Sequence, residues 1–118
     1  MNEIKIYGIP NCNSVKKALD WCDKHKVKYT FHNYKKEPAD AYQIKNWSKL
    51  VGWETLFNKK GTTWRSLAEK YKDITLTEKI AIELMLENNS IIKRPVIEYG
   101  KKIIVGYDEE QFKLLLKK

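Results

Sequence analysis

Cys12 and Cys22 are the only thiols in the 118-residue chain, and they lie in different sequence contexts. Cys12 follows an alternating, strand-like segment and the breaker Pro10, just where residues with helical spacing begin. Backbone N–H groups and the helix dipole at a helix N-terminus favour a thiolate over a thiol. The position therefore predicts that Cys12 is a nucleophile with a lowered pKa; the alternative is a small apolar plug beneath the loop.

Cys22 has the spacing of a core residue. It follows Val15, Ala18 and Leu19 at the intervals of one helix face. Ten helical residues separate it from Cys12, a rise of about 15 Å, which is too far for a disulfide. The motif C-x-x-C is also absent, because Val15 stands where a resolving thiol would be. We therefore expect an oxidised Cys12 to need an external thiol reductant.

The elements expected around Cys12 form a strand–helix–strand unit. Residues 3–7 alternate like a strand, residues 14–26 have helical spacing, and residues 27–34 are rich in β-branched and aromatic side chains. Such a unit predicts two parallel strands with a right-handed crossover. Residues 39–89 then have mostly helical spacing, and Thr75-Leu76-Thr77-Glu78 matches a capping box for one of these helices.

Strand patterns return near the end of the chain. Residues 95–99 and 102–107 flank Gly100-Lys101, which is typical of a hairpin turn, and Asp108 can cap a last helix. Without the helical insertion this is the element order of a thioredoxin fold. We therefore predict an α/β fold, thioredoxin-like or glutaredoxin-like, with a mixed four-stranded sheet. Residues 1–118 should form a single domain, with the insertion at about 39–89 packed on the same core.

The charge pattern argues against a nucleic-acid-binding protein. The formal net charge is +8, but Arg65 and Arg94 are the only arginines among 23 basic residues. Base readout and bidentate phosphate binding favour arginine, so a lysine-rich solvated surface is the simpler interpretation. His25 and His32 have no neighbouring ligands, and no metal is expected. With no bilayer-length apolar run and no secretion signal, the sequence predicts a cytoplasmic protein without membrane contact.

The ordered set of segments resembles a known family, the glutaredoxin-coupled arsenate reductases with the Spx-type regulators and the YffB-type thiol reductases. The matching pieces are Pro10-Asn11-Cys12 after the first strand, the helical stretch 39–89, and Ile91-Ile92-Lys93-Arg94-Pro95 before the third strand. The resemblance covers the whole chain. It is strongest to the YffB type, through Gly52-Trp53-Glu54 and residues 58–65 (NKKGTTWR).

The resemblance implies roles for several residues. Cys12 matches the nucleophile, and Arg94 matches an arginine that binds an anion beside it. Pro95 resembles the cis-proline that faces the cysteine in thioredoxin-like folds. Asn11 and Asn13, which flank Cys12, are further candidates for binding the substrate or its negative charge.

Three departures from the arsenate reductases weaken the expected anion site. Lys60 is the nearest match to a second arginine and keeps only its charge, while Tyr107 stands near the place of a third. Gly8 replaces a histidine that precedes the nucleophile. True arsenate reduction is therefore not expected, although the remaining site could still hold the carboxylates of a thiol such as glutathione.

Two functions follow from the resemblance. The first is a thiol-dependent reductase with no bound cofactor, in which a small thiol such as glutathione, or a glutaredoxin-like protein, resolves the adduct on Cys12. The alternative is a regulatory adaptor of the Spx type, whose partner would be the alpha subunit of RNA polymerase. Turnover of a reductant discriminates between them, because only the reductase consumes one.

Overall fold

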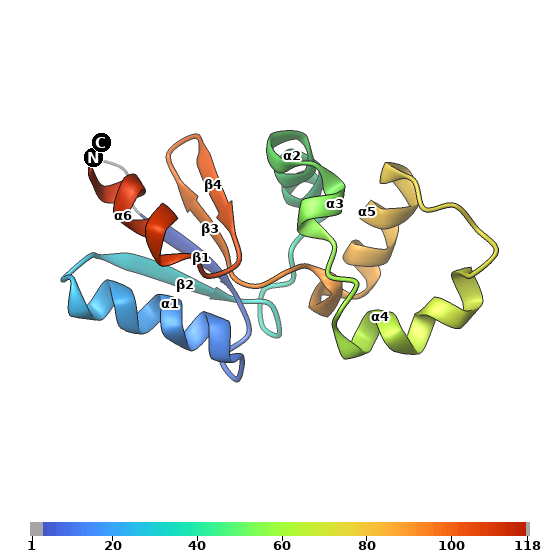
Figure 1. Cartoon of the computed structure of the whole chain (residues 1–118), viewed down its shortest axis with the longest axis horizontal. Coiled ribbons are helices and arrows are strands. Elements are labelled where there is room, and N and C mark those ends of the chain that lie inside the picture. The colour runs from blue at the N-terminus through green and yellow to red at the C-terminus, as the bar shows by residue number, and fades with distance from the viewer. Residues whose placement is uncertain (1–3, 118) are drawn as a thin grey trace. The chain divides into compact units, whose positions relative to one another are not determined.

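Strands from the two ends of the chain meet in one mixed sheet (Figure 1). The computed structural model describes residues 4–117, and the side chains of residues 4–114. The sheet contains four strands: β1 (Ile4–Gly8), β2 (Tyr29–Asn33), β3 (Val96–Tyr99) and β4 (Lys102–Val105). Their order is β2-β1-β3-β4; β1 and β2 are parallel, and β3 is antiparallel to both β1 and β4. The predicted thioredoxin-like fold is confirmed.

Two helices, α1 (Asn13–Lys24) and α6 (Glu109–Lys117), pack on one face of this sheet. Helix α1 connects the parallel strands β1 and β2, as the strand–helix–strand pattern predicts. The rings of Trp21 on α1 and Phe112 on α6 pack edge to face with their centroids 5.0 Å apart, and this contact joins the two helices. The core beneath them consists of buried apolar side chains: Ile4, Ile6, Ala18, Trp21, Cys22, Ile97, Ile104 and Phe112.

The opposite face of the sheet has a polar and aromatic character. Tyr7 on β1 and His32 on β2 are register partners, and their stacked rings have centroids 4.6 Å apart. The Tyr7 hydroxyl donates a hydrogen bond of 3.0 Å to Glu98 on β3. Because successive side chains of a strand point to opposite faces, this cluster lies away from the α1–α6 core.

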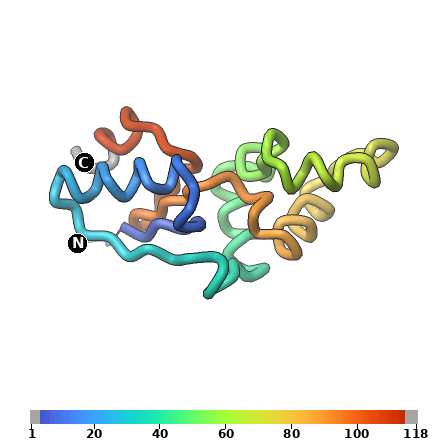
Figure 2. Tube along the Cα trace, turned by 90° about the horizontal axis from the view of Figure 1, so that it is seen from below, coloured from blue at the N-terminus to red at the C-terminus, as the bar shows by residue number. Residues whose placement is uncertain are grey.

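The segment between β2 and β3 forms a compact unit of its own. Residues Pro38–Lys93 make up this helical unit, and Met1–Glu37 together with Arg94–Lys118 make up the sheet unit. Figure 2 shows the chain leaving the sheet unit after β2 and returning to it at β3. The insertion agrees closely with the predicted 39–89, whereas the prediction of a single domain on one core stays a prediction.

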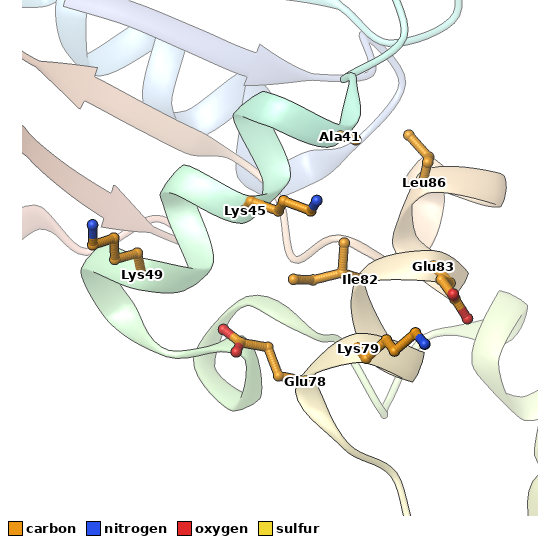
Figure 3. Close-up of a pocket in the computed structure, with 8 residues that line it drawn as sticks. All are labelled: Ala41, Lys45, Lys49, Glu78, Lys79, Ile82, Glu83 and Leu86. Atoms are coloured by element: carbon orange, nitrogen blue, oxygen red, sulfur yellow. The ribbon is translucent and has the colours of Figure 1, made fainter.

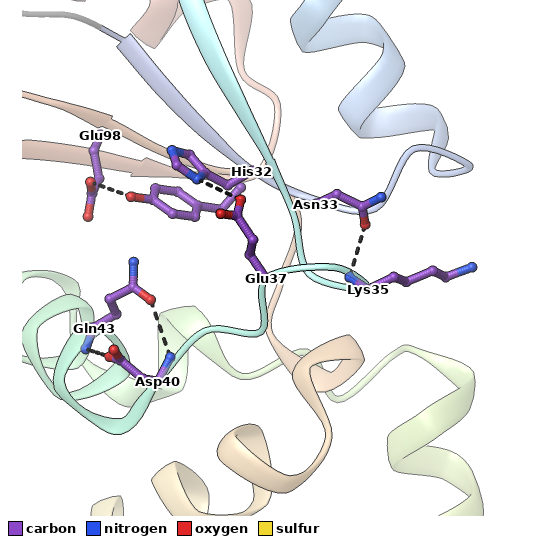
Figure 4. Close-up of polar contacts among 8 residues, drawn as sticks. His32, Asn33, Lys35, Glu37, Asp40, Gln43 and Glu98 are labelled. Carbon is purple, nitrogen blue, oxygen red and sulfur yellow. Dashed lines mark hydrogen bonds and ion pairs between the residues drawn. The ribbon is translucent and has the colours of Figure 1, made fainter.

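The helical unit begins at a capping box that the sequence analysis did not identify. Asp40 accepts a hydrogen bond from the Gln43 backbone N–H at 2.9 Å, and the Gln43 side chain accepts one from the Asp40 N–H at 3.2 Å (Figure 4). This pairing fixes the start of the first helix of the unit. The elements of the unit are α2 (Ala41–Val51), α3 (Trp53–Leu56), α4 (Thr62–Leu67), η1 (Ala68–Tyr71), α5 (Glu78–Glu87) and η2 (Asn89–Ile91).

The predicted capping box at Thr75–Glu78 is wrong. Thr77, not Thr75, caps α5 by accepting a hydrogen bond of 3.3 Å from the Ile80 N–H. Glu78 is therefore the first residue of the helix, and its side chain accepts a hydrogen bond of 2.7 Å from the Ser48 hydroxyl of α2. In a capping box that begins at Thr75, the Glu78 carboxylate would accept a hydrogen bond from the Thr75 backbone N–H. Here the carboxylate binds the Ser48 hydroxyl instead.

The last elements follow the sequence prediction. Gly100 has φ 62° in the tight turn between β3 and β4, a conformation that glycine adopts without strain. Asp108 accepts a hydrogen bond of 3.0 Å from the Glu110 N–H and caps α6. The hairpin and the capped helix are thus where residues 95–108 predict them.

Candidate functional site

Cys12 lies at the N-cap of α1. Strand β1 ends at Gly8, a short turn follows at Pro10 and Asn11, and Cys12 itself has extended dihedrals (φ −114°, ψ 127°). Its carbonyl accepts the first helical hydrogen bond, from Lys16 N–H at 2.9 Å. The thiol is partly exposed, at the carboxyl end of a parallel strand, where open α/β sheets bind their ligands.

The surroundings of Cys12 lower its pKa. Burial raises the pKa of the thiol, but the backbone N–H groups of Val15 and Ser14 and the Arg94 side chain, as donor and as positive charge, outweigh it. Each of these groups stabilises the thiolate more than the thiol. Cys22 has the opposite character: burial raises its pKa to about 11, and its side chain is fully enclosed. The two thiols therefore differ in solvent access and in the direction in which their pKa values are shifted.

Arg94 reaches the site from the segment that leads into β3. The Arg94–Pro95 peptide bond is cis, and the Pro95 side chain is fully buried. The Pro95 carbonyl accepts a hydrogen bond of 2.8 Å from Gly106 N–H, which ties this segment to the end of β4. A guanidinium beside a thiolate can bind a carboxylate or an oxyanion in two-pronged geometry.

The other predicted site residues are placed as follows. Asn11 and Asn13 flank Cys12 in the sheet unit and are exposed, so their part in binding stays a prediction. Lys60 belongs to the helical unit, in the turn before α4, where its backbone N–H donates a hydrogen bond of 3.1 Å to Asn58. Its side chain is exposed, and its part in anion binding also stays a prediction.

Tyr107, near the place of an arginine in the arsenate reductases, packs on the core. Its ring packs edge to face on the Phe112 ring, with the two centroids 5.3 Å apart, and lies against the α1–α6 core. The phenol therefore supplies no positive charge and takes part in packing rather than in an anion clamp.

Gly8 allows the strand, the helix and Arg94 to approach one another. A Cβ at this position would lie 2.7 Å from Val15 Cγ2 and 3.8 Å from Arg94 Cβ. The first distance is shorter than any real van der Waals contact, and Val15 is fully buried. A side chain at position 8 would thus displace the first turn of α1, which holds the Cys12 thiolate.

We expect Gly8→Ala to lower the free energy of unfolding by about 1–3 kcal/mol, because the added methyl overpacks the site. Val15→Ala removes the atom that it meets, so the double variant should lose less stability than the two single losses together. Urea denaturation of the four proteins measures this coupling. If the urea midpoint of Gly8→Ala equals that of the wild type, the close approach at Gly8 does not affect the free energy of unfolding.

Sequence analysis did not identify Tyr34, which lies beside this site. Its backbone N–H donates a hydrogen bond of 2.9 Å to the Gly8 carbonyl at the end of β1, and its side chain is buried. Tyr34 continues the alternation of His32 along β2, on the face opposite the α1–α6 core. The sequence signal that could have identified Tyr34 is this alternation, together with the position of an aromatic residue just after a predicted parallel strand.

A cavity of about 620 Å³ lies between α2 and α5 of the helical unit (Figure 3). Lysine and glutamate side chains surround an apolar floor that includes Ile82 and Leu86. The lining contains neither cysteine nor arginine, and we assign it no chemistry. Its residues are Ala41, Lys45, Lys49, Glu78, Lys79, Ile82, Glu83 and Leu86.

Residues 4–117 contain neither a membrane-spanning helix nor a metal-binding cluster. None of the helices there combines the length and the apolarity that a bilayer crossing requires. Within the same residues, no group of three histidine, cysteine or carboxylate side chains is arranged to hold a metal ion. Cys12 and Arg94 are therefore the strongest candidates for chemistry in the described part of the chain.

Comparisons with known proteins agree with this fold and identify the family of the chain. A solved YffB protein superposes with a TM-score of 0.91 at 43% identity, covering 96% of this chain and 98% of its own. An arsenate reductase (ArsC) related protein from Brucella melitensis has a TM-score of 0.76 at 42% identity, covering 98% and 96%. The global transcriptional regulator Spx 2 of Lactococcus lactis is 31% identical over 96% of this chain and 86% of its own length. The model of the ArsC family matches residues 7–115, and the chain belongs to the ArsC family.

Proposed function

We propose that this protein is a thiol-dependent oxidoreductase, with the Cys12 thiolate as nucleophile and Arg94 as the group that binds the negative charge of the substrate. The observation that carries the proposal is the position of Cys12 at the N-cap of α1, where, against the opposing effect of burial, backbone N–H groups and the Arg94 side chain lower the pKa of its thiol. A thiol with a lowered pKa beside a guanidinium is suited to attack a disulfide that has a carboxylate.

The chemistry is two rounds of thiol–disulfide exchange, each of two steps. The Cys12 thiolate attacks one sulfur of a disulfide, forms a mixed disulfide and expels the other sulfur as a thiolate. An external thiolate such as glutathione then attacks the mixed disulfide and regenerates the Cys12 thiolate. These steps release one half of the substrate as a thiol and join the other half to the external thiol in a new mixed disulfide. Cys12 then attacks the glutathione sulfur of that mixed disulfide and expels the second substrate thiolate, and a second external thiolate removes the glutathione from Cys12. Over both rounds the substrate disulfide is reduced to two thiols, and two molecules of the external thiol are oxidised to their own disulfide. Because Cys22 is buried and carries a raised pKa, the second thiol comes from outside the chain.

Arsenate is a poor candidate substrate. Tyr107 packs against Phe112 and offers no cation, and Arg94 is the only arginine in the sequence of the sheet unit. One guanidinium and the helix N-terminus suit a carboxylate better than a fully charged oxyanion.

The test is reduction of hydroxyethyl disulfide by reduced glutathione, coupled to NADPH oxidation through glutathione reductase. We expect NADPH consumption that rises in proportion to the added protein, and a single glutathione on Cys12 in intact-mass spectra when the reductase is omitted. If the rate stays at the uncatalysed background from about pH 6 to about pH 9, where thiolates form, the reductase proposal is wrong.

A second candidate function is a transcriptional adaptor. The similarity to the regulator Spx 2 over nearly the whole chain favours it. Its partner would be the alpha subunit of RNA polymerase. Retention of that purified subunit on the immobilised protein, together with no turnover of glutathione, would support the adaptor over the reductase.

A further inference from the structure

The Tyr34 hydroxyl is buried and has no hydrogen-bond partner among residues 4–114. The side chain is only 4% exposed. A buried hydroxyl without a partner loses its hydrogen bonds to water and gains nothing in return. A phenylalanine would fill the same space without that loss. We therefore expect the Tyr34 hydroxyl to have a role other than packing.

Tyr34 and Arg94 both lie against Gly8 at the end of β1. The Tyr34 backbone N–H donates a hydrogen bond to the Gly8 carbonyl, and a Cβ added at Gly8 would lie 3.8 Å from Arg94 Cβ. Burial, with Tyr7 and Glu98 nearby, raises the pKa of the phenol, and the opposing effect of Arg94 places the guanidinium within electrostatic range of it. The phenol thus stays neutral and retains a proton to donate.

Two neighbouring polar groups, the Tyr7 hydroxyl and His32 Nδ1, have other partners, whereas His32 Nε2 is buried without a hydrogen-bond partner among residues 4–114. The Tyr7 hydroxyl donates to Glu98 at 3.0 Å. His32, stacked on Tyr7, directs Nδ1 toward Glu37 at 3.5 Å (Figure 4). The cluster around Tyr34 is thereby held in place without using the Tyr34 hydroxyl.

We infer that the Tyr34 hydroxyl donates a hydrogen bond to the anionic group that Arg94 binds beside Cys12, so that a charged donor and a neutral donor share one ligand. The ligand class is a carboxylate on a thiol, a disulfide or another reagent that reacts with Cys12. This inference rests on the anion site of the proposed function and adds a specificity-determining residue to it.

The test compares two alkylating probes, iodoacetate and iodoacetamide. In both reactions the Cys12 thiolate attacks the CH₂ carbon, an S–C bond forms, the C–I bond breaks and iodide leaves. The probes differ in carrying a carboxylate or a neutral amide. The ratio of their second-order rate constants at Cys12, followed by mass spectrometry, therefore reports recognition of the anion and not the reactivity of the thiolate.

We expect Tyr34→Phe to lower the iodoacetate-to-iodoacetamide ratio several-fold, while the pH profile with iodoacetamide stays unchanged. Tyr29→Phe is the matched control: Tyr29 lies on the same strand but packs against the α1–α6 core, and Asp23 is near its hydroxyl. That variant should keep the wild-type ratio. A wild-type ratio in Tyr34→Phe would overturn the inference.

Thermal unfolding adds a readout that separates a structural role from a binding role. Removing an unpaired buried hydroxyl should leave the unfolding midpoint of Tyr34→Phe at or above that of the wild type. A lower midpoint together with an unchanged ratio would assign the hydroxyl to the fold and overturn the inference.

Failure of the inference and failure of the proposed function give different results, because alkylation needs no turnover. If Arg94→Ala lowers the ratio and Tyr34→Phe does not, the anion site stands and only the role of Tyr34 is wrong. If neither variant changes the ratio, the anion site itself is wrong, and the inference falls with it.

Discussion

Substituting serine for Cys12 is expected to reduce glutathione-dependent disulfide reduction by at least about three orders of magnitude. Serine has no thiolate, so neither the attack on a disulfide nor the mixed disulfide can form. The α1 N-terminus and Arg94 lower the pKa of the Cys12 thiol. A serine hydroxyl, whose pKa is far higher, stays protonated at the same position. The NADPH-coupled assay measures the loss, and intact-mass spectra should show no glutathione on the variant.

Cys22→Ala is the matched control for this experiment. Cys22 is fully enclosed in the α1–α6 core, and burial raises its pKa to about 11. It should not react, so its replacement by a smaller apolar residue should keep most of the turnover. Loss of activity in Cys22→Ala, in protein whose circular dichroism is unchanged, would mean that both thiols take part and that our single-thiol mechanism is wrong.

Replacing Arg94 with alanine is expected to shift the alkylation of Cys12 to higher pH. Reaction with iodoacetamide follows the thiolate fraction, which rises as pH rises through the pKa of Cys12. Arg94 lowers that pKa as a hydrogen-bond donor and as a positive charge. Without it, burial of the thiol is opposed only by the α1 backbone, so the midpoint of the pH profile moves up and the rate at neutral pH falls roughly fivefold or more.

Arg94→Lys separates charge from geometry in the same measurement. Lysine keeps the positive charge but not the planar fork, so its midpoint should lie between those of the wild type and Arg94→Ala. Arg65→Ala, which alters the only other arginine and lies in the helical unit, is the control and should leave the midpoint unchanged. An unchanged midpoint in Arg94→Ala would show that the helix N-terminus alone lowers the pKa.

Local sequence was sufficient for the elements around Cys12. The predicted helix 14–26 is found at Asn13–Lys24, and it ends before Lys26, whose φ of 56° is incompatible with a continuing helix. An N-terminus is formed by residues within one turn of each other, so periodicity and a preceding proline predict it. The position of Cys12 at this N-terminus, and the backbone N–H groups that face its thiol, follow from the same few residues.

The cap of α5 could not be predicted in this way. Thr75 and Thr77 both precede the apolar run, and Thr75 with Glu78 matches the box pattern better. The Ser48 hydroxyl of α2 binds the Glu78 carboxylate instead, and Thr77 makes the cap. A hydrogen bond between residues thirty positions apart thus accompanies a cap that the better local match did not predict.

The sequence by itself determined the order of strands and helices. It also predicted that Cys12 is the nucleophile and, through family resemblance, predicted roles for Arg94 and Pro95. Tertiary structure decided which side chains surround that cysteine. Antiparallel pairing of β1 with β3 brings Arg94 beside Gly8 and Cys12. Packing between distant segments leaves the Tyr34 hydroxyl buried without a hydrogen-bond partner in the described part of the chain, and it sets the Tyr107 ring against Phe112. The physical reason is that burial and hydrogen-bond satisfaction depend on strand register and packing between distant segments, which residue type and local spacing do not specify.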